Sequence, residues 1–565
     1  MSVYPPSASG QFSLDDSAVA ATIRVGRHVG PLEEGGDESF LEGGAAGASP
    51  GYAGRRGRHV ASRGEMEDGD ADADHSSAMK DLFGRGMLYT IVFAVQSAAA
   101  IVATPAITRL LGPANYGQVA LILLAAQIIT GVAGLGLQIG VQKEYAEPGG
   151  PAACRTLVSA CTLCSIGITL VLAVTVALWA PVVGFHGYSS ALELGVWWAG
   201  LSALGLTVAS LLRARDQLGA FIAVIGLQFV GGQVIGIVFL LTRGRTPADY
   251  MAGLLIGQAL GLCVGLIATR PTVTRGALAV TRRALAFSLP VVPHGLAFVV
   301  LAFGDRVIVR YDLGQAAAGR YQIAYNAGAV MILFLGMLNL AWEPRIFAIN
   351  DSDRLARVLA SSRNHLYRLQ VPLLLTTVLA APFLLRLLAP PSFHPERLLP
   401  VVALVAFAAF PFAAYLANLR VLLANRSTTP MLWVSPVAAV ANIALNVLLV
   451  PVLGLEGSAI ATLISYAALA ALTGMVARRL LLVAPVPVDI WVIVGCAIGL
   501  ATALAYVPAS LPSMCIELAV AVGSGVWSAA VLRRILNPVD LAVPQENDGR
   551  YGRRLLTYAF FGGEG

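Results

Sequence analysis

The densest group of ionisable side chains in the apolar part of this chain lies between residues 294 and 343. Arg306 and Arg310 are four residues apart, a spacing that places both guanidinium groups on one face of a helix. A guanidinium group is always charged and offers forked donors, so it suits phosphate. A charge buried without a partner should not persist. We therefore expect both arginines to face a cavity and to contact an anionic ligand there.

A second interpretation of these charges stays open. Asp305 precedes Arg306, and Asp312 lies close to Arg320, so each acidic residue has a basic neighbour in the sequence. Pairs of this kind would orient a loop and would need no ligand.

Other polar side chains of this region are candidates for lining the cavity or relaying protons. They are Asp305, His294, Glu343 and Asn326. Glu343 is followed by Pro344 and Arg345, so it can also pair at the membrane surface. Asn442 and Asn446 lie one helical turn apart, where they would line the cavity or form hydrogen bonds between helices.

These groups must be positioned by apolar helices. The hydrophobic fraction is 57%, the charged fraction is 12%, and the mean hydropathy is +0.74. Roughly fourteen apolar stretches of about 20 residues, the length that crosses a bilayer as a helix, follow one another from Gly86 to Leu532. We expect an all-α polytopic membrane protein with about 14 transmembrane helices. Their expected centres lie near residues 97, 126, 166, 201, 230, 260, 295, 331, 376, 410, 440, 466, 497 and 523.

The net charge of +6 indicates a topology and does not require a nucleic-acid partner. Placing the N-terminus and the C-terminus in the cytoplasm puts more than twice as many basic residues on cytoplasmic loops as on the opposite side. Arg420 and Arg426 are assigned to one such cytoplasmic loop. In the segment from Asn350 to Leu366, leucines form a stripe at helical spacing. This segment is predicted to be a helix lying on the inner membrane surface.

The sequence divides into five expected parts. Residues 1–82 are rich in Gly, Ala, Ser, Asp and Glu, which predicts a disordered cytoplasmic extension or a start site placed too early. The parts that follow are an N-terminal six-helix lobe at 83–280, a C-terminal six-helix lobe at 281–480, two additional helices at 481–537, and a cytoplasmic tail at 538–565.

The two lobes share a short repeat. Ile107-Thr108-Arg109 is followed by Gly112 and Gly117, and Ile308-Val309-Arg310 is followed by Gly314 and Gly319. Six helices per lobe would relate the lobes by a pseudo-two-fold axis along the membrane normal. Proline at Pro105, Pro290 and Pro293 would bend equivalent helices. Two such lobes form a transporter architecture with alternating access, although chance similarity between apolar segments remains the alternative.

Several stretches resemble the polysaccharide flippases, the Wzx-like branch of the multidrug/oligosaccharidyl-lipid/polysaccharide exporter superfamily. The stretches are Ile107 to Gly117, Asp305 to Val309 with Gly319 to Tyr321, Asn442 to Asn446 with Pro451, and Gly454 to Thr462. The resemblance covers about residues 79–535. The long N-terminal extension and the fourteen helices, where twelve are usual, depart from the family pattern.

The resemblance implies a flippase of the bacterial inner membrane that moves undecaprenyl-pyrophosphate-linked oligosaccharide or polysaccharide repeat units for cell-surface polysaccharide biosynthesis. Its partners would be the lipid-linked glycan, the bilayer and, as further candidates, a polysaccharide polymerase and glycosyltransferases. It would place Arg306, Arg310 and Arg109 in a cationic cavity.

Two other functions stay open: a flippase for the lipid-linked peptidoglycan precursor, and an ion-coupled small-molecule or multidrug exporter of the same fold. An enzyme such as a glycan polymerase would need a long external loop, so no enzymatic activity is expected. Lys80 and Lys143 do not follow glycine, so the chain contains no Walker A loop. No cofactor or metal site is predicted.

Overall fold

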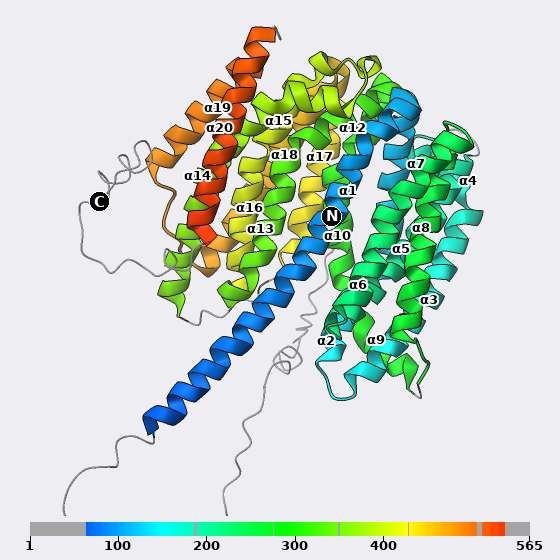
Figure 1. Cartoon of the computed structure of the whole chain (residues 1–565), viewed down its shortest axis with the longest axis vertical. Coiled ribbons are helices and arrows are strands. Elements are labelled where there is room, and N and C mark those ends of the chain that lie inside the picture. Colours follow the sequence, from blue (N-terminus) through cyan, green and yellow to red (C-terminus); the bar gives the residue numbers. More distant parts are fainter. Residues whose placement is uncertain are drawn as a thin grey trace, which may run out of the picture. The chain divides into compact units, whose positions relative to one another are not determined.

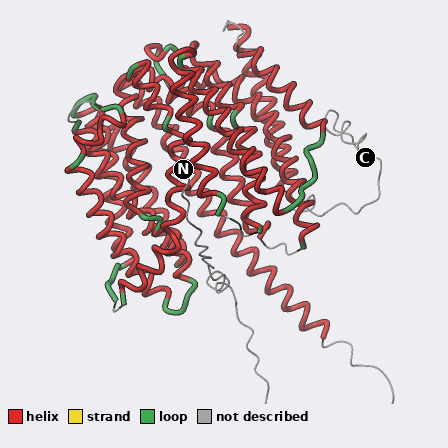
Figure 2. The backbone as a smooth tube through the Cα atoms, turned by 180° about the vertical axis from the view of Figure 1, so that it is seen from behind, coloured by secondary structure: helices red, strands yellow, loops and turns green. Residues whose placement is uncertain are grey.

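The computed structural model describes residues 64–185, 189–274, 276–347, 351–425, 427, 429–505 and 511–536. These residues form helices, short helical turns and loops, without any strand (Figure 2). The chain divides into two units, Met1–His75 and Ser76–Gly565. Predictions about residues 1–63 and 537–565 fall outside the described part of the chain.

The helices follow one another in this order (Figure 1): α1 (Gly64–Gly134), α2 (Leu137–Tyr145), α3 (Gly150–Val174), α4 (Val176–Trp179), α5 (Ser190–Ala214), α6 (Leu218–Ile225), α7 (Gly232–Thr242), α8 (Pro247–Thr269), α9 (Ala277–Ser288), α10 (Val292–Phe303), α11 (Asp305–Leu313), α12 (Gln315–Gly328), α13 (Val330–Phe347), α14 (Ser352–Leu388), α15 (Leu399–Phe407), α16 (Ala409–Ala424), α17 (Met431–Leu453), α18 (Leu455–Leu480), α19 (Val488–Ala505) and α20 (Leu511–Leu536).

The predicted all-α membrane architecture is confirmed. Every one of the fourteen expected centres lies within a helix or helical turn. Among the described residues, nine helices are long and apolar enough to cross a membrane, and the bent pair Gln315–Gly328 and Val330–Asn339 would make a tenth. One of these long segments, Met431–Leu480, contains two expected centres, and the centre expected near residue 97 lies just before the start of Ala98–Gly134. The number fourteen therefore stays a prediction.

We call helices α1–α8 the first lobe and α10–α18 the second lobe, and the expected bounds of the lobes stay a prediction. In the first, α8 packs against α5 and α7; in the second, α18 packs against α16 and α17. The link between them is broken at the 3-10 turn Leu289–Val291, which contains Pro290 as expected. On one side of the break, α9 packs against α2 and α3, whereas α10 packs against α17. The bend therefore lets one span contact both lobes. Helices α19 and α20 pack against α14.

The amphipathic segment before residue 366 is helical but is not a separate surface helix. Its residues belong to α14, which continues without a break from Ser352 to Leu388. The leucine stripe is buried, with Leu355, Leu359 and Leu366 at 8%, 3% and 1% exposed. No glycine or proline lies between residues 351 and 371, so nothing in the sequence around residue 366 stops the helix.

Arg420 does not lie in a cytoplasmic loop as predicted. It belongs to α16 and is 1% exposed. Its Nε donates a hydrogen bond of 2.9 Å to Oδ1 of Asn339 on α13. A position near the end of an apolar run was interpreted as a loop, whereas the helix continues to Ala424.

Helix α1 begins at Gly64, so residues 64–82 of the predicted extension are helical. Its first turns carry Glu65, Glu67 and Asp68, and acidic residues favour a helix N-terminus.

We expect a chain that begins at Met79 to insert into the membrane and to restore function in a deletion strain. The residues it lacks are mostly small or acidic and offer little apolar surface to bury. The measurement is protein level in the membrane fraction together with complementation, with the full-length chain as control. A normally expressed but inactive Met79 chain would show that the preceding segment has a function.

Candidate functional site

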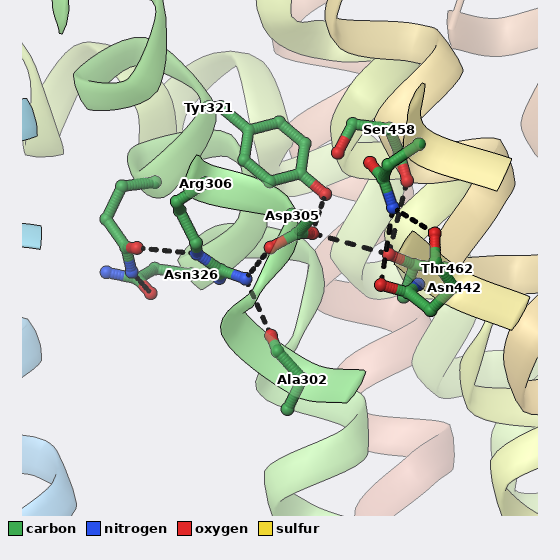
Figure 3. A network of polar contacts seen from close by, with 10 residues as sticks. Ala302, Asp305, Arg306, Tyr321, Asn326, Asn442, Ser458 and Thr462 are labelled. Atoms are coloured by element: carbon green, nitrogen blue, oxygen red, sulfur yellow. Dashed lines mark hydrogen bonds and ion pairs between the residues drawn. The ribbon is translucent and has the colours of Figure 1, made fainter. Parts of the chain in front are cut away.

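Asp305 and Arg306, at the start of α11, form a buried ion pair (Figure 3). Both side chains are 0% exposed, and Nη1 of Arg306 lies 2.5 Å from Oδ1 of Asp305. The same Nη1 donates to the carbonyl oxygen of Ala302 at 2.6 Å, and Nε donates to Oε1 of Gln322 at 3.0 Å. Arg306 thus pairs with Asp305, as the second interpretation of these charges predicts, and its role in a cavity stays a prediction.

The second carboxylate oxygen of Asp305 joins two further helices to the pair. The Tyr321 hydroxyl on α12 donates to it at 2.6 Å, and the Thr462 hydroxyl on α18 lies 3.4 Å away. The Tyr325 ring lies under the guanidinium group of Arg306, 4.0 Å from Cζ, within the range of a cation–π contact. Arg306 thus has both an anion and an aromatic face as partners inside the second lobe.

Further buried side chains that carry oxygen atoms lie on α17 and α18. Asn442 and Asn446 on α17 and Ser458 on α18 are all 0% exposed. Nδ2 of Asn446 donates to the backbone oxygen of Asn442 at 2.9 Å, and no described group hydrogen-bonds to Oδ1 of Asn446. Carboxylate, hydroxyl and amide oxygens are the ligands of hard cations. Chemically, this group can accept a proton at Asp305 or hold a small cation beside it.

Arg310 lies one turn further along α11, where the two lobes meet. Its side chain is half-buried and packs on Gly184 of the first lobe, where an added Cβ would lie 3.1 Å from Cγ of Arg310. The neighbouring Tyr311 donates its hydroxyl to the carbonyl oxygen of Pro181. Arg310 forms no ion pair with any described residue.

Arg109 also joins the lobes, at the end of the first part of α1. Its guanidinium group donates to the carbonyl oxygens of Pro105 at 2.8 Å and of Leu387 at 3.1 Å. Thr108 donates to the carbonyl oxygen of Leu388 at 2.6 Å. The carbonyls of Leu387 and Leu388 end α14, where a cation is favoured by the helix dipole.

The glycines of the predicted repeat have matching backbones. Gly112 has φ 70° and ψ 175°, and Gly314 has φ 90° and ψ 170°, a region open almost only to glycine. The glycines five residues later touch one another. A Cβ on Gly117 would lie 2.8 Å from N of Gly319, and a Cβ on Gly319 would lie 2.9 Å from N of Gly117. The repeat is therefore present in the structure, and its two copies pack directly together.

The remaining predicted residues are less closely connected to the ion pair. Asn326 accepts a hydrogen bond of 2.7 Å from Gln322, which in turn binds Arg306. His294 on α10 shares a hydrogen bond of 2.8 Å with Ser435 on α17. Glu343 lies on α13, and its side chain is outside the described part. Asp312 and Arg320 form no ion pair among the described contacts.

Sequence reasoning missed Tyr321, Gln322 and Thr462 as members of this network. The stretches around Tyr321 and Thr462 were noticed only as part of a resemblance. A hydroxyl 157 positions away in the sequence gives no sign that it contacts Asp305.

Comparison with known proteins agrees with this fold. Residues 83–350 match the sequence model of a family described as polysaccharide biosynthesis protein. The lipid II flippase MurJ in its inward closed conformation has a TM-score of 0.58 and 11% identity, with 80% of this chain and 99% of MurJ covered. A point mutant of the Vibrio cholerae MATE transporter VcmN has a TM-score of 0.51 and 16% identity, with 71% of this chain and 98% of VcmN covered. No protein of curated function matches the sequence. At these identities the two structures establish the fold alone, that of multi-pass membrane transporters.

Proposed function

We propose that this chain, whose residues 83–350 match the polysaccharide biosynthesis protein family, is a flippase for lipid-linked oligosaccharide or polysaccharide repeat units. The family match carries this proposal, because it concerns glycan synthesis, whereas the structural likeness concerns only the fold. A transporter, and not an enzyme, is the function that this fold supports.

The likeness to MurJ favours a second candidate, a flippase for the peptidoglycan precursor, which is a lipid-linked glycan as well. The likeness to VcmN favours an ion-coupled exporter of small molecules. The arginines at the lobe junction support an anionic substrate over the cations that an acidic cavity would select.

Arg310 and Arg109 are the proposed contacts for the pyrophosphate of the carrier lipid. Both lie where the lobes meet, and Arg310 has no carboxylate partner among the described residues. Arg306 is neutralised by Asp305, so it can contribute only when Asp305 releases it. His294, Asn326 and Glu343 remain proposed polar residues of the cavity.

Asp305 is the proposed coupling residue. A proton or small cation bound at its carboxylate would weaken the hold on Arg306 and free that charge for the substrate. The hydroxyl and amide oxygens beside Asp305 support this role.

We further propose the bacterial inner membrane as the location, with both termini in the cytoplasm, and glycosyltransferases and a polymerase as functional partners. Under this proposal, a strain lacking the chain accumulates lipid-linked glycan on the cytoplasmic face and loses surface glycan. Accumulation of peptidoglycan precursor would favour the second candidate. Unchanged glycans with altered drug sensitivity would favour the exporter.

Replacing Arg310 with alanine is expected to lower export about tenfold or more while leaving membrane insertion intact, because a charge-assisted hydrogen bond contributes about 1.5–3 kcal/mol. Lysine should restore part of the activity, since the charge survives without the forked geometry. Surface glycan and protein level are measured together. Arg243→Ala is the control, because Arg243 is exposed and stacks on Phe239 of its own helix, 3.8 Å from the ring centre. Equal losses in both variants would contradict the proposed contact.

A further inference from the structure

We propose that a cavity beside the first turns of α14 binds the phosphate headgroup of an anionic membrane lipid. The cavity measures about 540 Å³. One wall is a polar face of α14, and the other is the extended segment 481–487 that joins α18 to α19. The polar or charged lining side chains are Asp353, Arg357, Ser361, Asn364, His365 and Arg368.

The second wall is held in place by contacts with α14. Nη2 of Arg363 donates to the carbonyl oxygen of Ala484 at 2.7 Å. Nη2 of Arg368 pairs with Oδ2 of Asp489, the second residue of α19, at 3.1 Å. The cavity is therefore built by two specific interactions between segments that lie more than a hundred residues apart.

The charge in and around the cavity favours an anion. Residues 351–368 contain four arginines and two aspartates, a net charge of two positive. Asp489 on α19 lowers this net charge to one positive. Arg357 is exposed and forms no ion pair with any described residue, and Arg368 uses only Nη2 for Asp489. Guanidinium groups at this position suit a phosphate, and basic pockets between spanning helices bind lipid headgroups.

The surroundings place the cavity at the level of a membrane interface. The rings of Tyr367 and Trp491 lie 5.9 Å apart beside it, and these residue types gather where lipid meets water. Leu482, Val488 and Val492 next to it are 84%, 76% and 58% exposed. A headgroup in the cavity would thus leave its acyl chains against this apolar face. That arrangement favours a lipid over a free phosphate ion.

The test is a titration of the purified full-length protein in detergent with phosphatidylglycerol, read by native mass spectrometry. Arg357→Ala is expected to weaken binding about fivefold, because each arginine near a membrane surface contributes about 1 kcal/mol to binding of anionic lipid. Arg357→Glu should weaken it further. Phosphatidylcholine should bind weakly to every variant, and millimolar inorganic phosphate should displace little phosphatidylglycerol.

Arg354→Ala is the matched control. Arg354 lies on the same turn of α14 and is also exposed, but it does not line the cavity. Its replacement should leave binding within about twofold, because an exposed charge that does not contact the ligand contributes little. Equal losses in both variants would indicate diffuse surface charge, and unchanged binding in Arg357→Glu would exclude the site. Full displacement by inorganic phosphate would assign the cavity to a soluble anion instead.

Discussion

Replacing Asp305 with alanine is expected to lower the free energy of unfolding by about 3–5 kcal/mol and to abolish export. The change leaves the guanidinium group of Arg306 buried without its counterion, which is the costly way to break an ion pair. It also removes the acceptor for Tyr321. Thermal unfolding in detergent and surface glycan measure the two effects.

The double variant Asp305→Ala/Arg306→Met separates stability from function. Removing both charges should recover most of the stability, because a buried pair often stabilises no more than apolar side chains of similar volume. Export should stay lost, since neither the coupling carboxylate nor the released arginine remains. Recovery of export in the double variant would show that the pair only holds α11, α12 and α18 together.

Arg420 provides the comparison within the same lobe. It is as buried as Arg306, and its Nε donates a hydrogen bond to the neutral side chain of Asn339. Arg420→Met should alter stability without changing how export depends on pH or sodium. Asp305→Asn removes the charge but keeps most of the side-chain shape, so it should change how export depends on pH or sodium. The same ion dependence in both variants would contradict a coupling role for Asp305.

The helices were predictable because a membrane leaves few alternatives. A backbone in lipid must satisfy its own hydrogen bonds, so an apolar run of sufficient length is a helix wherever it lies. The break at Pro290 and the buried leucines of α14 followed from local rules in the same way.

Contacts between distant segments were less predictable. The partner of Arg306 was visible in the sequence because Asp305 is adjacent, although sequence reasoning did not choose between pairing and binding. The contact of Asp305 with Thr462 depends on how α11 packs near α18, which no local pattern encodes. Arg420 shows the opposite error. Its charge led to the prediction that it lies in a loop, whereas its side chain is buried.

The short glycine repeat was predictable in its backbone conformation but not in its contacts. Equal spacing of Gly112 and Gly117 and of Gly314 and Gly319 indicated equivalent structure, and the φ and ψ angles confirm it. The spacing did not indicate that the copies would touch. Tyr116 and Val119 of the first lobe share a buried cluster with Tyr321 of the second, which surrounds this contact. The glycines are therefore needed for close approach as well as for the turn.

Replacing Gly319 with alanine is expected to separate the lobes at this contact and to reduce export strongly. The added Cβ would collide with the carbonyl oxygen of Pro113 and lie 2.9 Å from N of Gly117. Both are backbone atoms, which cannot rotate away as a flexible side chain could. An alternating-access transporter that cannot close one end cannot complete its cycle.

Spin labels at Val102 and Leu387, which are 76% and 60% exposed, would report the separation of α1 and α14. Their distance distribution should shift to longer values in Gly319→Ala. Gly336→Ala is the matched control, because Gly336 also lies in a helix of the second lobe but has no atom within 4 Å of an added Cβ. That control should gain up to about 1 kcal/mol from helix propensity and should keep normal export.

Gly117→Ala should reproduce the effect of Gly319→Ala, because each glycine occupies the space that a side chain on the other would need. Once the Cβ of one alanine has separated the two helices, the Cβ of the second alanine causes little further collision. The double variant should therefore lose less export than the product of the two single losses, as expected for residues in direct contact. Independent, multiplicative losses would mean that each glycine serves only its own helix, and an unchanged distance distribution would contradict the closing contact itself.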